Sequence, residues 1–315
     1  MTRPARRAPQ PHAMTGVRGS VLLVVVAGIL FGTTGTAKAL GPAGIPPIAA
    51  GILRIQIGAL ALLAVMPLVG ARRGRLPVLW RRPQILVTAV AAALYQPFFF
   101  GAVSSAGVAL GTLVAVGSEP VFAGLLGWAV LRHRPTVGWL AATGIAVVGL
   151  GLRSSGQLEG GDPVGLLLAL GAGLCSACYT VAAKHQLDRD ATAIEVPAAS
   201  FVLGGLLLAP MLIGQPMAWL ATPRGASLVV YLGVATMAIA NVVLARGIHG
   251  LPPGPTATLM LTDPVVATLL GVVVLGEALG PVAALGVALV LAGLVLQGIV
   301  VARTSPGDLE PAPVL

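Results

Sequence analysis

Residues 120–131 read PVFAGLLGWAVL, and residues 264–275 read PVVATLLGVVVL. At this offset of 144 residues, eight of the twelve positions are identical. An acid stands immediately before each copy, Glu119 before the first and Asp263 before the second. Both acids lie within long apolar runs, where insertion scales put the cost of a charge near ~3 kcal/mol. A costly group placed twice at equivalent points indicates a repeated unit in which the acids have a role.

The composition is that of a polytopic membrane protein. The 315 residues are 57% hydrophobic and only 9% charged, with a mean hydropathy of +0.95, whereas soluble domains carry roughly 25% charged residues. Too few polar side chains remain to cover a surface that faces water. The net charge of +9 does not indicate a nucleic-acid partner, because the basic residues lie in the breaks between apolar runs.

The apolar runs are long enough for membrane helices. A helix needs about 20 apolar residues to cross a ~30 Å hydrocarbon core, and strands are excluded because the runs are long and do not alternate. The sequence therefore predicts an all-α fold of ten transmembrane helices in the lipid bilayer. The predicted spans cover residues 20–39, 47–70, 84–101, 107–131, 136–153, 163–184, 195–214, 226–246, 254–276 and 280–302.

The positions of the basic residues predict the orientation. With the N-terminus inside, 15 of the 19 Lys and Arg residues fall on the inner side and three on the outer side, while Arg54 lies in a span. Since cytoplasmic loops carry the excess of positive residues, both termini are expected on the cytoplasmic side of a plasma membrane. Residues 1–19 are expected to form a basic cytoplasmic tail, starting at Met1 or Met14, and residues 303–315 a second one.

Ten spans and an offset of 144 predict two repeats of five spans, at residues 20–153 and 163–302. Because five is odd, the second repeat enters the membrane in the opposite sense. Inverted repeats are typical of secondary transporters, whose substrate site lies near the midplane where the halves meet. The first spans support the pairing, since GILFGTTGTAK ends at Lys38 and GLCSACYTVAAK ends at Lys184.

Several motifs follow the order found in one transporter family. They are FGTTGTAK at 31–38, Arg54 in the second span, the PVFAGLL block with its basic loop, and TDPVVATLLGVVVLGEALGPVAALGVALVLAGLVL at 262–296. Over nearly its whole length the chain resembles the EamA-type family of the drug/metabolite transporter superfamily, as two EamA repeats. The resemblance implies ten spans, both termini inside, and movement, often export, of small metabolites. One position departs from it: His133 stands where the second repeat has Glu277, and members commonly have an acid at that turn in both halves.

Glu119 and Asp263 are the leading candidates for binding substrate or protons. At 1.5 Å per residue, Glu119 lies ~18 Å from the outer end of its span and Asp263 ~14 Å from the inner end of its own, so both fall near the midplane. Each precedes a proline, Pro120 or Pro264, which frees a carbonyl one turn back and can kink the helix. Such a site suits a cation or an ammonium group, and its carboxyl could exchange a proton. The alternative is a fixed acid that only holds helices together.

Three cations within or at the ends of spans are further candidates. Arg54 lies at a depth from which it could pair with Glu119 or hold a substrate carboxylate, and the alternative is snorkelling to the surface along its stem. Lys38 and Lys184 close the first span of each repeat, where the helix dipole favours a cation. Their expected role is gating or anchoring.

Uncharged polar side chains inside the spans are candidates for lining a substrate cavity. The alternative for each is a local hydrogen bond or helix packing. These residues are Thr33, Thr34, Tyr95, Gln96, Tyr179 and Asn241.

The expected function is secondary transport, in the export direction, of a small metabolite such as an amino acid or amine. Alternating access would move the small-molecule substrate, with protons as a candidate coupling ion, in a monomer or homodimer. The alternatives are a non-coupled facilitator, a membrane scaffold and, least favoured by the sequence, an intramembrane head-group enzyme. No enzyme activity, cofactor or metal site is expected, because the histidines form no ligand set and Walker, HExxH and GxSxG motifs do not occur. Cys175 and Cys178 are interpreted as small packing residues.

Overall fold

The computed structural model describes residues 16–154 and 162–303. Within these ranges ten helical segments are long and apolar enough to cross a membrane, which confirms the predicted ten-span, all-α architecture. The expected tails, and Met14 as an alternative start, lie outside the described residues except for residues 16–19 and Arg303.

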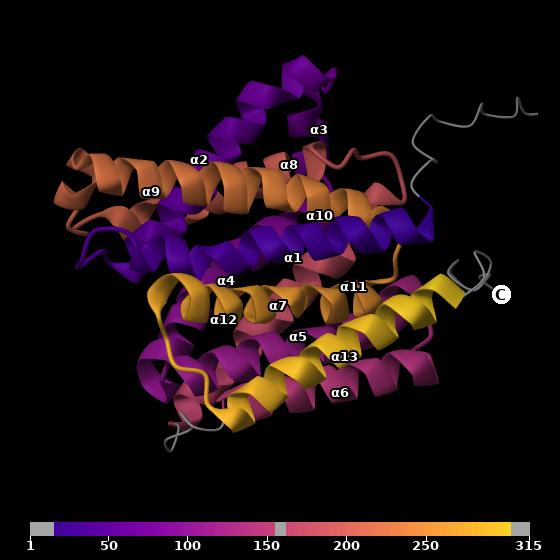
Figure 1. Cartoon of the computed structure of the whole chain (residues 1–315). Helices are drawn as coiled ribbons and strands as arrows, with labels where there is room; N and C mark the ends of the chain where they lie inside the picture. The colour runs from indigo at the N-terminus through magenta and orange to yellow at the C-terminus, as the bar shows by residue number, and fades with distance from the viewer. Residues whose placement is uncertain (1–15, 155–161, 304–315) are drawn as a thin grey trace, which may run out of the picture.

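Each repeat contributes five spans, and Figure 1 labels the helices that form them. Short 3₁₀ turns extend α2 and α8, the π-helix η6 joins α9 to α10 in one span, and α11 and α12 together form another. The first repeat consists of α1 (Val17–Ala39), α2 (Pro47–Val65), α4 (Pro83–Ala106), α5 (Val108–Leu131) and α6 (Val137–Ser154). The second consists of α7 (Pro163–Leu187), α8 (Glu195–Leu208), α9 (Pro223–Gly233), η6 (Val234–Ile239), α10 (Ala240–His249), α11 (Pro253–Met260), α12 (Thr262–Leu275) and α13 (Pro281–Arg303).

Proline determines where many of the spans begin. Six of the ten start at a proline, which suits the first helical turn because its missing N–H would be unpaired there in any case. Two of these starts also have a side-chain cap: Asp162 accepts a hydrogen bond from the backbone of Val164, and Thr222 from that of Gly225. The span boundaries therefore follow from local sequence.

The helices pack mainly across the two repeats. The third span of the first repeat, α4, lies against α7, and its counterpart in the second repeat, α10, lies against α1. In the same way, α5 contacts α7, and its counterpart in the second repeat, α11 with α12, contacts α1. Two further contacts join equivalent spans of the two repeats, α2 with α8 and α6 with α13. Exchanging the repeats reproduces the contacts, so the two halves form one bundle with internal pseudo-symmetry.

The repeated stretch ends in the same way in both copies. The backbone N–H of His133 bonds to the carbonyl of Gly127 at 3.2 Å, and that of Glu277 bonds to Gly271 at 3.0 Å. In each copy this bond follows a residue in the left-handed conformation, which commonly ends a helix. Gly276 takes that conformation with φ 72°, and Arg132 takes it at the equivalent position with φ 62°. The backbone cap is therefore the same whether His or Glu stands at the turn.

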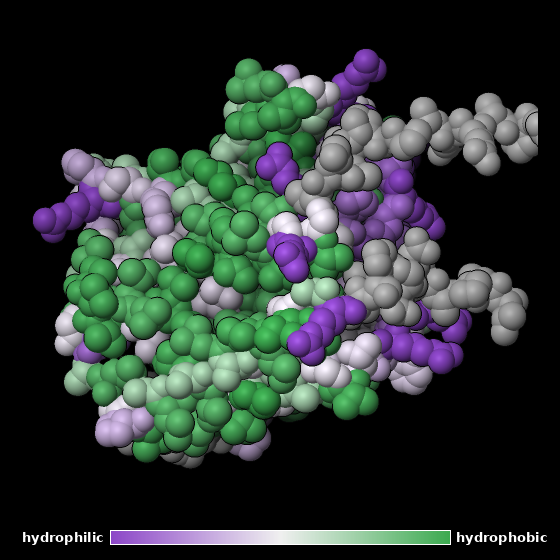
Figure 2. Space-filling view, turned by 45° about the vertical axis from the view of Figure 1, so that its right-hand side comes forward, coloured by the Kyte–Doolittle hydropathy of each residue, from purple (hydrophilic) through white to green (hydrophobic). Residues whose placement is uncertain are grey.

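The surface has the distribution of a membrane protein. Figure 2 shows apolar side chains across the middle of one face and hydrophilic ones toward its two ends. Large apolar side chains are exposed on many of the spans; Leu22, Leu60, Leu167 and Val295, for example, are each more than 60% exposed. This apolar band fits the hydrocarbon region of a bilayer.

Candidate functional site

The two repeated acids lie at the centres of their spans. Glu119 is the twelfth of the 24 residues of Val108–Leu131, and Asp263 is the eleventh of the 23 residues of Pro253–Leu275. Both side chains are partly buried, and the charges of the two acids act on each other. The fold therefore brings the fourth span of each repeat together around one central region.

Glu119 lies where α5 meets α7. The hydroxyl of Ser176 on α7 is close enough to its carboxylate to interact with it as a donor. The helices are in close contact here, since a Cβ atom on Gly173 would lie 2.6 Å from the carbonyl oxygen of Ala115. Among the described residues, no basic side chain forms an ion pair with Glu119. Its negative charge is left with a hydroxyl partner and no paired cation.

Asp263 has a different environment. Its span breaks at Leu261, and Asp263 stands in the first turn of α12, well inside the membrane-spanning segment. Two cations, Arg54 of α2 and Arg153 of α6, act electrostatically on it. Asp263 is therefore compensated by positive charge from two helices, whereas α5 continues without a break across Pro120.

Arg54 has hydrogen-bonding capacity that its neighbours do not use. Its guanidinium carbon lies 5.9 Å from the centre of the Phe31 ring of α1, a cation–π contact. Its Nε is buried without a hydrogen-bond partner in the described part of the chain. The sequence placed Arg54 at the depth of Glu119, whereas the acid that acts on it in the structure is Asp263 of the other repeat. A guanidinium of this kind can bind the carboxylate of a ligand.

Aromatic side chains of α4 lie near these charges. Tyr95 interacts electrostatically with both acids and with Arg54, and its ring stacks on Phe99 with centroids 5.5 Å apart. The ammonium group of Lys38 lies 5.4 Å from the centre of the Phe100 ring. Tyr95 and Lys38 thus belong to the same central group as Glu119, Asp263 and Arg54.

Gln96 is placed against α2. It is 6% exposed, and its side-chain oxygen approaches Gly51 so closely that a Cβ there would lie 2.6 Å away. Gln96 therefore packs α4 on α2.

Two of the threonines expected to line a cavity are in α1. Thr33 donates to the carbonyl of Leu30 at 2.6 Å and accepts a hydrogen bond from Tyr231 of α9 at 2.7 Å. The hydroxyl of Thr34 is buried and has no hydrogen-bond partner among the described residues. Thr33 joins the two repeats, and Thr34 keeps a free polar group inside the bundle.

Asn241 makes a local contact that modifies its helix. Its side-chain amide donates to the carbonyl of Met237 at 2.8 Å, next to the π-helix η6. The equivalent position 144 residues earlier is Pro97, inside α4, and proline also leaves the carbonyl four residues back without its helical partner. Both repeats therefore disturb their third span at the same point.

Tyr179 and Lys184 of α7 take part in packing. The ring of Tyr179 stacks on Phe201 of α8 with centroids 6.1 Å apart. The ammonium of Lys184 pairs with Asp188 at 2.8 Å and donates to the carbonyl of His249, at the C-terminal end of α10, also at 2.8 Å. Lys184 thus anchors α7 to α10, unlike its counterpart Lys38 in the central group.

Sequence reasoning did not select two partners of the central acids. Ser176 was missed because a serine in an apolar span is common and carries no signal by itself. Arg153 ends the predicted span 136–153 and was counted only as one of the three basic residues on the outer side; in the structure its Nε donates to Thr268 of α12. A search for polar residues facing the repeated stretch would have found Ser176, but only once the pairing of α5 with α7 was known.

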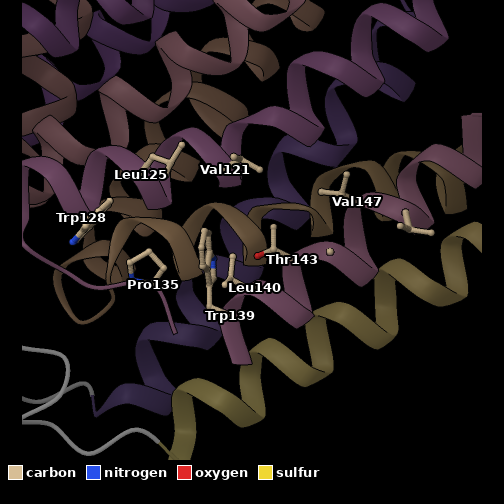
Figure 3. Close-up of a pocket in the computed structure, with 10 residues that line it drawn as sticks. Val121, Leu125, Trp128, Pro135, Trp139, Leu140, Thr143 and Val147 are labelled. Atoms are coloured by element: carbon tan, nitrogen blue, oxygen red, sulfur yellow. The ribbon is translucent and has the colours of Figure 1, made fainter. Parts of the chain in front are cut away.

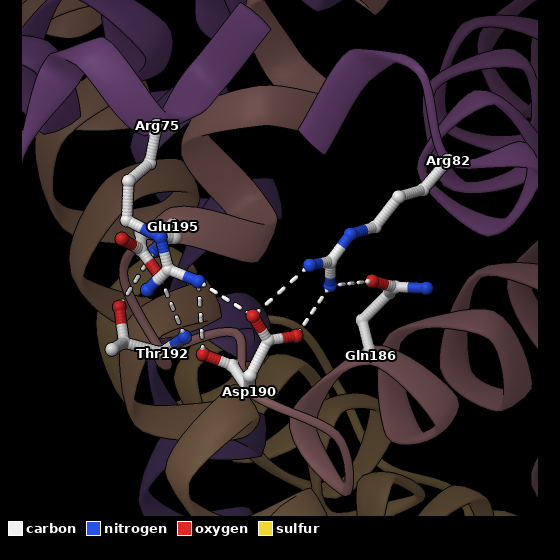
Figure 4. A network of polar contacts seen from close by, with 6 residues as sticks. All are labelled: Arg75, Arg82, Gln186, Asp190, Thr192 and Glu195. Atoms are coloured by element: carbon white, nitrogen blue, oxygen red, sulfur yellow. Dashed lines mark hydrogen bonds and ion pairs between the residues drawn. The ribbon is translucent and has the colours of Figure 1, made fainter. Parts of the chain in front are cut away.

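A polar network joins the two repeats at one end of the bundle (Figure 4). Asp190 accepts hydrogen bonds from Arg82 at 2.5 and 3.0 Å and from Arg75 at 2.8 Å. The side chain of Glu195 is 2% exposed; it accepts from Arg75 at 3.2 Å and from the backbone of Thr192 at 2.9 Å. A buried carboxylate is tolerated when its charge and lone pairs are satisfied in this way. The network fastens the α2–α4 loop of the first repeat to the α7–α8 loop of the second.

Replacing Asp190 with asparagine should lower the stability of the folded protein at neutral pH. The side chain of Asp190 is 49% exposed, so the expected loss in the free energy of unfolding is at most about 1 kcal/mol. The hydrogen bonds from Arg82 hold the pKa of Asp190 below its ordinary range. The stabilisation is therefore present above the unfolded-state pKa of about 3.9 and is lost as the pH falls through the lower folded-state value.

Thermal unfolding in detergent as a function of pH tests this prediction. The wild type should unfold at a higher temperature than Asp190→Asn at pH 7, and the two should converge in acid. Arg72→Gln is the control, because Arg72 is exposed and forms no ion pair with a described residue. A difference that persists unchanged below pH ~3 would contradict the assignment to the Asp190 carboxylate.

Known proteins resemble this chain over most of its length. The EamA-like transporter family matches residues 18–154 and 163–298. The uncharacterized transporter YwfM of Bacillus subtilis is 38% identical over 276 residues, which cover 87% of this chain and 92% of that protein. The threonine/homoserine exporter RhtA of Escherichia coli is 30% identical over 283 residues, covering 86% and 88%.

Two further comparisons agree with these. A probable terminal-alkyne amino-acid exporter of Streptantibioticus cattleyicolor is 29% identical over 247 residues, which cover 77% of this chain and 81% of that protein. A solved crystal structure superposes with a TM-score of 0.78 over 90% of this chain and 98% of its own. At 22% sequence identity, this last similarity concerns the fold alone.

Proposed function

The chain belongs to the EamA-like transporter family of multi-pass membrane proteins, and from this we propose that it exports a small zwitterionic metabolite, an amino acid or close analogue. The observation that carries the proposal is the difference in the charges that surround the two central acids. Arg54 and Arg153 act electrostatically on Asp263, whereas no cation acts in this way on Glu119, and neither acid forms a close ion pair with a described residue. A substrate ammonium group would supply the charge that Glu119 lacks.

The central group also suits the carboxylate of such a substrate. Arg54 has a buried Nε without a partner among the described residues, and Lys38 is near enough to act electrostatically on it. Two cations close together attract an anionic group, and a guanidinium binds a carboxylate with two parallel hydrogen bonds. A zwitterion with its ammonium at Glu119 and its carboxylate at Arg54 would satisfy both sites at once.

The relatives are in keeping with this substrate class. The exporter of Escherichia coli is named for threonine and homoserine, and that of Streptantibioticus cattleyicolor for an amino acid. Both groups of substrates carry an ammonium and a carboxylate. We extend the class, and not a particular amino acid, to this chain.

We further propose alternating access coupled to protons across a plasma membrane, with both termini on the cytoplasmic side. The two repeats contact each other through α1 with α12 and through α5 with α7, and these pairs carry the two acids. Rocking of one repeat against the other would expose the central group to either side in turn. Glu119 would hold either the substrate ammonium or a proton, but not both at once. Movement of the substrate in one direction would therefore be coupled to movement of a proton in the other.

Transport by the variant Arg54→Gln tests the substrate class. The rate of uptake into inside-out vesicles is measured for a labelled amino acid, such as threonine, and separately for the labelled amine that lacks its carboxylate. The wild type should move the amino acid faster. Arg54→Gln should slow the amino acid roughly 10–100-fold, because a charge-assisted bond is lost, and should leave the amine unaffected.

Two controls accompany this experiment. Arg224→Gln removes an exposed arginine outside the central group and should transport like the wild type. Removing the proton gradient should stop accumulation; equilibration that ignores the gradient would instead indicate a facilitator. Equal slowing of the amine and the amino acid in Arg54→Gln would contradict the assignment of Arg54 to the carboxylate.

A further inference from the structure

An apolar groove of about 650 Å³ lies between α5 and α6, and no residue of the central group lines it (Figure 3). Trp128 and Pro135 line it near one end and Val147 near the other. Leu125 and Leu140 line its middle and are 49% and 55% exposed. In a chain that spans the bilayer, side chains exposed at this level face lipid.

The polar groups of the groove are already satisfied from inside the protein. The hydroxyl of Thr143 and that of Thr258 on α11 share a hydrogen bond of 2.8 Å, and the indole N–H of Trp139 donates to Thr258 at 3.1 Å. A polar occupant would therefore find no partner in the middle of the groove. This favours a hydrocarbon occupant.

The length of the groove corresponds to one leaflet. From Trp139 to Val148, α6 rises ~14 Å at 1.5 Å per residue, which is about half of a ~30 Å hydrocarbon core. An acyl chain that enters at the interface would extend along the groove to the midplane.

The mouth of the groove is basic. Arg132 and Arg134 are exposed in the loop that joins α5 to α6, and no acid among the described residues pairs with them. The neighbouring Trp128 is 52% exposed, and its indole N–H makes no hydrogen bond with a described residue. These groups suit the phosphate of a lipid headgroup.

The backbone at Arg132 gives a second reason to assign it a ligand. Arg132 has φ 62°, a left-handed conformation that the second repeat fills with Gly276. Glycine adopts this conformation without strain, whereas a residue with a Cβ does not. Keeping an arginine at this position despite the strain indicates that the side chain is needed at the mouth of the groove.

We propose that the α5–α6 groove binds one anionic phospholipid of the leaflet at the Arg132 end, with an acyl chain along the groove and the headgroup on Arg132 and Arg134. The lipid would lie outside the central group and would hold α5, which carries Glu119, against α6. The proposal does not depend on which substrate is transported.

Native mass spectrometry of the purified full chain, titrated with phosphatidylglycerol or phosphatidylcholine, tests the acyl-chain site. Gly144→Phe should fill the groove, since Gly144 lines it and a Cβ there meets nothing within 4 Å. Binding of both lipids should fall more than about tenfold, because each displaced methylene contributes roughly fourfold in affinity. Gly151→Phe is the matched control, because Gly151 is on the same helix, is equally open, and lies outside the groove.

The charge of the site is tested separately. The double variant Arg132→Gly with Arg134→Gln should weaken phosphatidylglycerol about 30-fold, at about fivefold for each basic side chain, and leave phosphatidylcholine unchanged. Its thermal stability should not fall, because glycine relieves the strained turn. The control is Arg72→Gln with Arg81→Gln, which removes the same charge from another exposed loop and should retain the preference for phosphatidylglycerol.

Three results would overturn the proposal. One is lipid binding by Gly144→Phe that equals that of the wild type. Another is a loss of phosphatidylglycerol in the Arg72 and Arg81 control as large as in the Arg132 and Arg134 variant, which would mean diffuse attraction to a basic surface. The third is a wild-type protein that is dimeric and a Gly144→Phe variant that is monomeric but binds lipid like the wild type. The groove would then be a contact between copies of this chain.

Discussion

Replacing Glu119 with glutamine is expected to reduce amino-acid transport roughly 100-fold, at the upper end of what the loss of one charged hydrogen bond accounts for. Glutamine has the same size and can still accept a hydrogen bond from Ser176, so the contact between α5 and α7 should persist. The negative charge, and with it the partner for a substrate ammonium or a proton, is removed. The amount of protein in the membrane and its thermal stability should stay close to the wild type.

The measurement is uptake into inside-out vesicles containing equal amounts of each variant. Asp162→Asn is the control, because it removes the charge of an exposed acid outside the central group and keeps a side-chain oxygen at the N-cap of α7. That variant should transport normally. Full activity of Glu119→Gln would show that this acid only fixes helix packing, and the central group would then need another site for the ammonium.

Replacing Gly149 with leucine is expected to have the largest effect on stability. A Cβ on Gly149 would lie 2.6 Å from the carbonyl oxygen of Gly286 and 2.6 Å from the backbone nitrogen of Val290. These atoms belong to the backbone of α13, so no side chain can move aside, and α6 must separate from α13. Overpacking commonly costs 1–3 kcal/mol and sometimes more; with two backbone clashes we expect a loss of about 3 kcal/mol or more in the free energy of unfolding.

Size-exclusion chromatography and thermal unfolding in detergent measure this loss. Gly151→Leu, two residues along the same helix, is the matched control, since a Cβ there meets no atom within 4 Å and the expected change is below about 0.5 kcal/mol. A Gly149→Leu protein that remained monodisperse and unfolded at the wild-type temperature would mean that α6 and α13 are not in backbone contact in the membrane.

Close contacts of this kind are expected where helices associate in lipid. The hydrophobic effect does not drive helices together there, so packing of small residues does. A similar close contact is found between α1 and α12, where a Cβ on Gly32 would lie 2.7 Å from the backbone carbonyl oxygen of Asp263. Small residues therefore determine how closely the first span of one repeat approaches the fourth span of the other.

The amino-acid sequence by itself determined the number of spans, their approximate ends and the presence of two five-span repeats. These properties depend on one-dimensional signals: the length of apolar runs, prolines at helix starts and the repeat at an offset of 144 residues. It also placed Glu119 and Asp263 at the centres of their spans, because depth follows from counting residues along a helix of known rise.

Only the tertiary structure decided which groups face one another. Arg54 acts electrostatically on Asp263 and not on Glu119, and Ser176 is the polar side chain beside Glu119. Lys184 anchors α7, while Lys38 lies near Arg54. The physical reason is that these helices are apolar on nearly all sides, so their sequences carry almost no signal for rotation about the helix axis. That rotation is determined by close contacts between small residues of different helices, far apart in the chain, and it decides which acid has a cation beside it.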